Sequence, residues 1–152
     1  MNLEFRYCYL EVNDFDNLQK LIRLKCLFIQ QCKLKFIPEK VLRMAWLEKL
    51  HLNGNFIKKI TNDISFLRSL SVLNVSDNKL QHITPDSLSK LENLKSLDIS
   101  DNPNLKMDAL HEVLDCKELQ NLVCPSHLMD KTTLDKRNDI DQERLRYLTQ
   151  PN

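Results

Sequence analysis

Hydrophobic residues in this chain follow a local pattern that recurs at nearly constant spacing. The clearest copy is residues 70–80, LSVLNVSDNKL, in which an apolar residue fills the first, fourth, sixth and last places. Copies in the same phase start at Leu24, Leu47, Leu94 and, less regularly, Leu119, so that the starts are 23, 23, 24 and 25 residues apart. This regularity predicts a solenoid in which each copy forms one coil.

The alternation inside each copy predicts a short strand. Side chains alternate along a strand, so Leu73 and Val75 would point inward and Asn74 outward. Strands stacked about 4.8 Å apart could join their apolar pairs into one continuous core. The expected inward pairs are Leu27/Ile29, Leu50/Leu52, Leu73/Val75, Leu97/Ile99 and Leu122/Cys124.

Asparagine recurs shortly after three of these strands, at Asn55, Asn78 and Asn102. The chain must turn sharply there, and an inward amide can hydrogen-bond the backbone groups that the turn leaves without partners. Cys8 and Cys32 occupy the same place in two earlier copies. We therefore predict a structural ladder rather than a catalytic site.

The first ten residues also fit the pattern. A shift of 24 residues places Leu27 and Ile29 onto Leu3 and Phe5, so the chain is expected to begin inside a repeat. An open first strand with bare apolar side chains needs a cover. Three interpretations stay open: residues that precede this sequence are missing from it, the segment forms its own short cap, or this end docks a partner.

Apolar residues spaced three or four apart predict how the chain returns between strands with one side against the core. Pro38 and Pro85 stand where short helical turns would start, and Thr84 is the expected cap of the second. Residues 107–115, with Asp108 as an N-cap, predict a longer helix. The convex side should therefore be partly helical and partly irregular.

The periodicity stops after Leu128. We expect a solenoid over residues 1–129, with a partial first repeat and about five further strands, and a capping segment over residues 130–152. In that segment Asp139 could begin a helix that closes the last coil. The residues expected to carry the closure are Ile140, Arg144, Leu145 and Leu148.

The repeat resembles the leucine-rich repeat signature, L-x-x-L-x-L-x-x-N-x-L. The later order Leu134-Asp135, Ile140, Glu143-Arg144 is similar to the C-terminal cap of intracellular leucine-rich repeat proteins, although the usual upstream tyrosine-arginine pair is missing. That group includes a phosphatase-1 regulatory repeat protein, the small nuclear ribonucleoprotein A-prime and an axonemal dynein light chain. The resemblance covers about residues 3–148.

The resemblance implies an α/β fold: a right-handed leucine-rich repeat solenoid, or horseshoe. Its short parallel strands would line the concave face, and mixed helical and irregular segments would form the convex side. In the family, the concave face binds another protein.

Composition narrows the expected setting. The 152 residues are 42% hydrophobic and 28% charged, with a formal net charge of +1, which suits one soluble domain. No stretch approaches the roughly 20 apolar residues of a membrane span, and the start lacks a basic segment followed by an apolar run. Several of the five cysteines fall on packing positions, which favours a reducing compartment, the cytoplasm or the nucleus.

The repeat also predicts which side chains decorate the concave face. Aromatic and basic groups gather toward its N-terminal end and carboxylates toward its C-terminal end. Phe28 is the main candidate anchor, because aromatic residues anchor interfaces; the alternative is that it packs on Tyr7 or His51. The full candidate set for partner binding is Tyr7, Phe28, Gln30, His51, Asn53, Asn74, Asp77, Asp98 and Asp101.

The acidic candidates carry a specific hypothesis. Asp98 and Asp101 are expected to lie together and to receive a lysine or arginine of the partner. Ser-Asp-Asn after a strand also favours a turn, so Asp77 and Asp101 have a structural interpretation as well.

Other kinds of site find little support. Cys116, Cys124 and His127 do not have a usual zinc spacing, and a single glycine leaves no glycine-rich phosphate loop. Trp46 is expected to cover the edge of the core. We expect no catalytic residue, metal or cofactor.

Nucleic acid is not the expected partner either. It requires a basic stripe with stacking aromatic rings, whereas the concave positions set Arg6, Lys49 and His51 against Glu4 and three aspartates.

The resulting prediction is a non-catalytic protein-binding or scaffold module that recognises a protein or peptide on its concave face. One alternative is a regulatory or substrate-receptor subunit that docks through its open N-terminal end, with end-to-end contact through the first repeat. A third is a component of a ribonucleoprotein.

Overall fold

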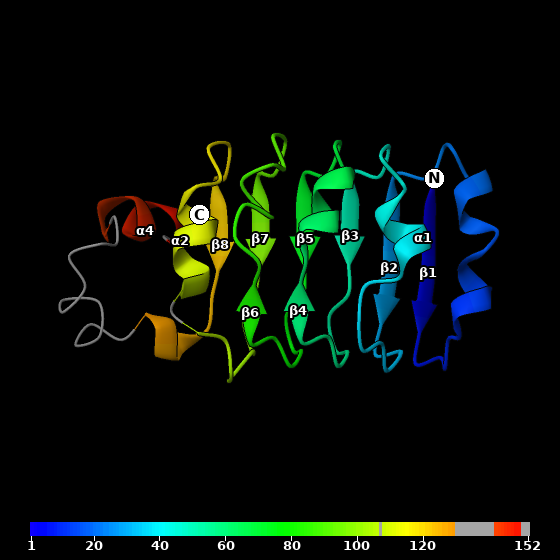
Figure 1. The fold of residues 1–152 in the computed structure, drawn as a ribbon, viewed down its shortest axis with the longest axis horizontal. Coiled ribbons are helices and arrows are strands. Elements are labelled where there is room, and N and C mark those ends of the chain that lie inside the picture. The colour runs from blue at the N-terminus through cyan, green and yellow to red at the C-terminus, as the bar shows by residue number, and fades with distance from the viewer. Residues whose placement is uncertain (107, 130–141, 150–152) are drawn as a thin grey trace.

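The computed structural model describes residues 1–106, 108–129 and 142–149, and shows successive coils stacked side by side (Figure 1). Each coil contributes one strand to a parallel sheet in the order β1-β2-β3-β5-β7-β8. The strands are β1 (Asn2–Arg6), β2 (Cys26–Gln30), β3 (Lys49–His51), β5 (Val72–Asn74), β7 (Ser96–Asp98) and β8 (Asn121–Val123). The prediction of an α/β leucine-rich repeat solenoid with short parallel strands is confirmed.

The register of the sheet follows the spacing of the repeats. Leu3 pairs with Leu27, and Leu27 with Leu50, so equivalent residues of neighbouring coils lie directly beside one another. The same alignment continues through Leu73, Leu97 and Leu122. The shift of 24 residues that placed the first ten residues inside a repeat therefore describes β1 correctly.

Apolar side chains from all coils form one core. The inward residues from Leu27 to Ile99 have no exposed surface, whereas Leu3 and Phe5 of the first coil are only partly buried. Burying one leucine or isoleucine side chain stabilises a fold by about 1.5–3 kcal/mol. The shared core is therefore the main reason that such short strands persist.

The asparagine ladder forms as predicted, and Asn78 shows how it works. Its Oδ1 accepts a hydrogen bond from the backbone N–H of Ile57 (2.9 Å), and its Nδ2 donates to the carbonyls of Leu52, Val75 and Ser76 (3.0–3.1 Å). Asn55 and Asn102 make equivalent bonds. Each amide thus joins the turn of its own coil to the coil before it.

In five of the six coils that the structure describes, one residue adopts a left-handed backbone conformation at or shortly after the end of the strand, where the chain turns out of the sheet. These residues are Tyr7 (φ 54°), Gln31 (φ 55°), Gly54 (φ 73°), Asp77 (φ 48°) and Asp101 (φ 51°), and the coil of β2 has a second such residue, Lys33 (φ 60°). Residues with a Cβ rarely take this conformation, and aspartate is among those that tolerate it best. The turn interpretation of Asp77 and Asp101 is therefore correct as far as the backbone is concerned.

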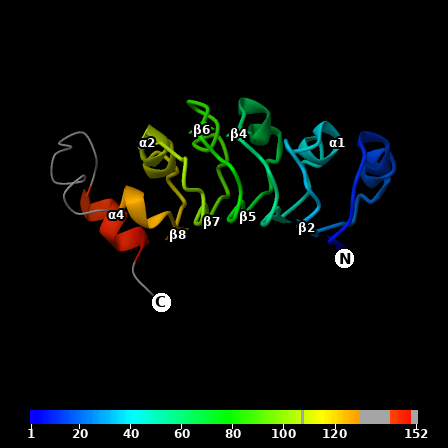
Figure 2. The same ribbon diagram turned by 90° about the horizontal axis from the view of Figure 1, so that it is seen from below.

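Short helices and turns cover the convex side, while the strands line the opposite, gently concave side (Figure 2). The prediction of a mixed helical and irregular convex surface is thus confirmed. The helical elements are η1 (Val12–Phe15), η2 (Leu18–Lys20), α1 (Glu39–Leu42), η3 (Asn62–Phe66), α2 (Asp108–Leu114), η4 (Ser126–Leu128) and α4 (Gln142–Leu148). A second sheet of two short parallel strands, β4 (Lys59–Ile60) and β6 (His82–Ile83), was not predicted.

The two prolines behave differently. Pro38 directly precedes α1, as predicted. No helix follows Pro85, because Asp86 has a left-handed backbone (φ 59°) that a right-handed helix excludes. The backbone N–H of Thr84 instead donates to the carbonyl of Ile60 (2.9 Å), beside β6, and within the described part of the chain its hydroxyl has no hydrogen-bond partner. The prediction that Thr84 caps a helix is wrong.

The last described helix, α4, lies at the end of the stack next to α2 (Figure 1). Leu145 and Leu148 are almost fully buried in the core. The Arg144 guanidinium donates to backbone carbonyls at and just after the end of α2: Nε to Leu114 (3.0 Å), and Nη2 to Cys116 (2.6 Å) and Lys117 (3.5 Å). Of the other residues assigned to a cap, Leu134, Asp135, Asp139 and Ile140 lie outside the described residues.

Candidate protein-binding face

The concave face presents columns of side chains, one from each strand. The column at the centre of the strands is in register from end to end, because each strand meets its neighbour at equivalent positions. From the N-terminal end it contains Glu4, Phe28, His51, Asn74, Asp98 and Val123. Its chemistry changes from aromatic near β2 to acidic at β7.

Two rings stack in this column. The Phe28 and His51 rings lie 4.5 Å apart between centroids, with an angle of 11° between their planes, and both residues are half-buried. Phe28 therefore packs on His51, one of the two neighbours expected for it, and its role as an anchor for a partner stays a prediction. The other candidate neighbour, Tyr7, remains 78% exposed. Together the two rings offer a broader flat surface than either would alone.

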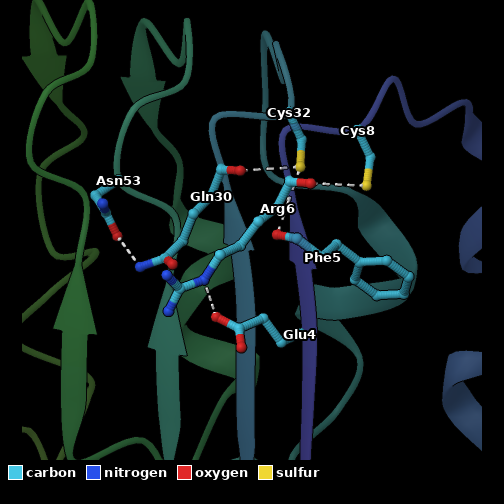
Figure 3. A network of polar contacts seen from close by, with 7 residues as sticks. All are labelled: Glu4, Phe5, Arg6, Cys8, Gln30, Cys32 and Asn53. Carbon is cyan, nitrogen blue, oxygen red and sulfur yellow. Dashed lines mark hydrogen bonds and ion pairs between the residues drawn. The ribbon is translucent and has the colours of Figure 1, made fainter.

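Polar side chains beside the rings are tied to one another across strands. The Gln30 Nε2 donates to the Asn53 Oδ1 (2.7 Å), as Figure 3 shows. One coil further, the Asn74 Nδ2 donates to the Asp98 Oδ2 (3.2 Å). These bonds fix the orientation of four of the predicted site residues before any partner is present.

At the N-terminal end of the face, Arg6 and Glu4 form an ion pair with each other (Figure 3). The same view shows the thiols of Cys8 and Cys32 donating to backbone carbonyls, with Cys32 bonded to those of Phe5 and Gln30. Cys26 occupies an outward position of β2, yet it is buried. It lies between Asn2 and Lys49 in the sheet register, and we attribute its burial to these longer side chains.

The carboxylates at the C-terminal end of the concave face differ in how many hydrogen bonds they already accept. The Asp98 Oδ1 accepts hydrogen bonds from the N–H (3.0 Å) and the hydroxyl (2.7 Å) of Ser100, and its Oδ2 is held by Asn74. Asp77 and Asp101 are exposed, and neither forms an ion pair with another described residue. They occupy the same place in adjacent coils. The two exposed carboxylates can therefore take a cation more readily than Asp98 can.

The ring pair has a titratable member. Burial lowers the pKa of His51 below its ordinary value of 6.5, the nearby Lys49 ammonium lowers it further, and Asp98 acts in the opposite direction. His51 is therefore neutral near pH 7. Its ring stacks on Phe28 as an uncharged imidazole.

Val123 lies on the same face but is not among the candidate residues predicted from the sequence. It is 54% exposed and ends the central column on β8. Its place in the repeat was a sufficient signal, because it occupies the same central strand position as the other members of the column.

The residues that suggested other chemistry have structural roles. The His127 Nε2 hydrogen-bonds the carbonyl of Leu105 (2.9 Å), and the Trp46 Nε1 donates to that of Leu21 (3.1 Å) while its ring packs on the core. Burial raises the pKa of Cys116 to about 12 and that of Cys124 to about 11, so both thiols stay protonated. No three metal-ligating side chains of the described residues come together as a metal site.

Among the described helices, none has the length and apolar character needed to cross a membrane.

Comparisons with known proteins agree with this architecture. A family model described as leucine rich repeat matches residues 45–103. The chain is 35% identical to the rat (Rattus norvegicus) volume-regulated anion channel subunit LRRC8D over 89 residues, which are 57% of the chain. It is also 32% identical to a probable U2 small nuclear ribonucleoprotein A' of Caenorhabditis elegans over 71 residues, or 47% of the chain. The chain spans only 10% and 28% of the lengths of these two proteins.

A solved internalin from Listeria monocytogenes has a similar fold, with a TM-score of 0.61, 23% identity, and coverage of 82% of this chain and 36% of that protein. Leucine-rich repeat domains generally act as non-catalytic modules that mediate contacts between proteins, and structures of this fold include complexes with protein or peptide ligands. The repeated sequence, the coil-by-coil sheet and the family match lead to the same conclusion: the chain folds as a leucine-rich repeat solenoid.

Proposed function

We propose that this protein is a non-catalytic binding module that holds a segment of another protein against its concave face. The stacked rings of Phe28 and His51 carry the proposal, because they form a half-buried aromatic surface in a central column whose other members, apart from Val123, are polar. Aromatic side chains of this kind dominate the energy of many protein interfaces. The general role of the family as a protein-binding module supports the same function.

The surroundings of the rings favour binding with a small entropic cost. Gln30 is bonded to Asn53 and Asn74 to Asp98, so these groups lose little freedom when a partner arrives. Groups already oriented in the free protein lower the cost of association.

The chemistry of the face suggests what the partner segment contains. An apolar or aromatic side chain would cover the Phe28 and His51 rings. A lysine or arginine two or three coils away would reach the carboxylates at the C-terminal end. We expect Asp77 and Asp101 to contribute most to this contact, because Asp98 already accepts three hydrogen bonds within the chain.

The test compares capture of partners from the native source by the wild-type protein and by Phe28→Ala, with the recovered proteins measured by quantitative mass spectrometry. Loss of an anchor residue typically costs 2 kcal/mol or more, so a true concave-face partner should be depleted by roughly tenfold or more. Phe66→Ala, an equal truncation of an exposed ring in η3, is the matched control.

If the two truncations deplete the same partners equally, the concave face is not the binding surface. Charge reversal of Asp101 and Asp98 in separate variants then tests the acidic end. Partner affinity unchanged by both reversals would remove the proposed cation contact.

One observation favours a second candidate, docking through the N-terminal end. Leu3 and Phe5 remain partly exposed, while their equivalents in the inner coils are completely buried. In this alternative the protein would be a regulatory or substrate-receptor subunit. Leu3→Ser with Phe5→Ser would then abolish capture, and Phe28→Ala would leave it unchanged.

We infer a reducing compartment, the cytoplasm or the nucleus, as the place where this function operates. All five cysteines are free thiols, and Cys26, Cys32 and Cys116 are buried at packing positions. A disulfide-rich framework, the usual solution in small oxidised domains, is not what holds this core together.

A further inference from the structure

Six lysines gather along one edge of the solenoid, away from the concave face. Five of them lie in the segments that follow the strands of the large sheet, and Lys59 begins β4; these segments run along the lower edge in Figure 1. We call this surface the basic edge and define its cations as Lys33, Lys35, Lys58, Lys59, Lys79 and Lys106. All six are exposed, and none lies within ion-pair distance of a carboxylate among the described residues.

The backbone places these turns directly beside one another. The N–H of Phe56 donates to the carbonyl of Leu34 (2.7 Å), and the N–H of Lys79 donates to that of Ile57 (3.0 Å). Further along the chain, Gln81 bonds to Lys58 and Lys106 bonds to Gln81. Consecutive coils therefore contribute their lysines to one continuous surface, with a spacing of about 4.8 Å per coil.

The charge on this edge contrasts with the rest of the molecule. The chain has 22 basic and 21 acidic residues, and six of the basic ones belong to the basic edge. The rest of the chain contains 16 basic and 21 acidic residues, so its net charge is negative. Residues 30–38 and 53–61, which form the centre of the basic edge, contain no acidic residue. The next acidic residues along the chain are Glu39 and Asp63.

Two aromatic rings stand among the lysines. Phe36 and Phe56 are both exposed, at 60% and 45%. Phe56 fills the repeat position that Lys33 and Lys79 fill in the coils on either side, so a cation, a ring and a cation follow one another along the stack. An exposed ring between unpaired cations offers a flat face for stacking beside sites for anions.

We propose that the basic edge is a second binding site, for single-stranded nucleic acid, with lysines contacting the phosphates and Phe36 and Phe56 stacking on bases. Proteins that bind single strands combine a positive track with aromatic rings in this way. The earlier expectation against nucleic acid rested on the side chains of the concave face, which do not belong to this edge. An acidic peptide or an anionic membrane would also match the charge, but the two exposed rings among the lysines favour a ligand with bases that stack on them.

The test measures binding of a fluorescently labelled 15-nucleotide oligouridylate by anisotropy across a salt series. The variant Lys33→Gln/Lys58→Gln/Lys59→Gln should weaken binding at least tenfold at low salt. For single strands the logarithm of affinity falls with the logarithm of salt concentration with a slope of about −0.7 per phosphate contact, so the slope should become shallower by about 2.

A matched control removes three exposed lysines elsewhere: Lys90→Gln/Lys95→Gln/Lys117→Gln. It changes the net charge equally and should weaken binding less than threefold. Phe56→Leu keeps an apolar side chain without the ring, and loss of one stacked base should weaken binding about fivefold or more. Circular dichroism verifies that each variant is folded.

Several results would overturn the proposal. The two lysine variants could lose affinity equally, which would reduce the binding to bulk charge. Polyglutamate could compete as well as the oligonucleotide, which would identify an acidic protein segment as the ligand. Capture by phosphatidylserine vesicles without oligonucleotide binding would identify a membrane surface instead.

Discussion

At the scale of single residues, the few asparagines of the ladder contribute strongly to the stability of the fold. Asn78 is almost fully buried and makes four hydrogen bonds to backbone groups of two coils. Its replacement by alanine leaves those groups buried without partners, at about 1–3 kcal/mol for each group that stays unsatisfied.

We therefore expect Asn78→Ala to lower the free energy of unfolding by about 3 kcal/mol or more, measured by urea denaturation. Lys79→Ala, at the exposed neighbouring position, is the control and should change it by less than about 0.5 kcal/mol. Equal effects of the two substitutions would show that the ladder bonds contribute nothing to stability.

The sequence was sufficient to predict the asparagine ladder, because its positions follow from the repeat and its role from the hydrogen-bonding chemistry of an amide. It was not sufficient to decide between the two interpretations of Phe28, because stacking on His51 depends on side-chain rotamers that a repeat pattern does not specify. Alternation gives the outward position of Cys26 but not its burial, because it does not tell whether neighbouring side chains cover a residue.

At the scale of elements, the strands were predictable and the returns only partly so. Each strand is set by inward leucines at fixed spacing. The return after Pro85 depends on one residue, Asp86, whose left-handed backbone replaces the expected helical turn. The small sheet of β4 and β6 forms because the return segments of two consecutive coils are both extended there. The spacing of apolar residues in these segments fits an extended chain and a helix equally well, so it did not predict the sheet.

The sheet also sets the protonation of the candidate site. Lys49 precedes His51 by two residues on β3, and Asp98 lies two strands away in the same column. We expect Lys49→Ala to raise the pKa of His51 and Asp98→Asn to lower it further, because Lys49 disfavours and Asp98 favours the imidazolium. NMR titration of the His51 ring measures both shifts, and a pKa that both variants leave unchanged would contradict this account.

The same group makes stability depend on pH. The folded-state pKa of His51 lies below its ordinary value of 6.5, so the unfolded chain binds the proton first as the pH falls. Its contribution therefore reduces stability progressively from about pH 6.5 downward, until the folded protein is also protonated.

At the scale of the whole molecule, the stack needs closed ends. We propose that the segment from residue 130 onward is a C-terminal cap, with α4 as its described part. Two observations support this: Leu145 and Leu148 are buried in the core, and Arg144 donates to carbonyls at and just after the end of α2.

We expect Leu145→Ala to lower the free energy of unfolding by about 2–4 kcal/mol. Because each coil contacts mainly its neighbours, the loss should be local at first, with amide hydrogen exchange accelerated in β8 more than in β3. Tyr147→Ala, at an exposed position of the same helix, should change neither quantity appreciably. Uniform acceleration across the sheet would show that α4 does not protect the end of the stack in particular.

The unbroken register of the sheet makes each coil an interchangeable cassette. A tandem duplicate of residues 70–93 would bring its own strand, ladder asparagine and return, and could be accommodated between β5 and β7 with every neighbour still aligned. The aromatic pair and the acidic turn of Asp101 would then move apart by about 4.8 Å, with both left chemically intact. The distance between these two candidate contact regions can thus be changed by one coil at a time, by natural duplication or by design, without changing the residues of either region.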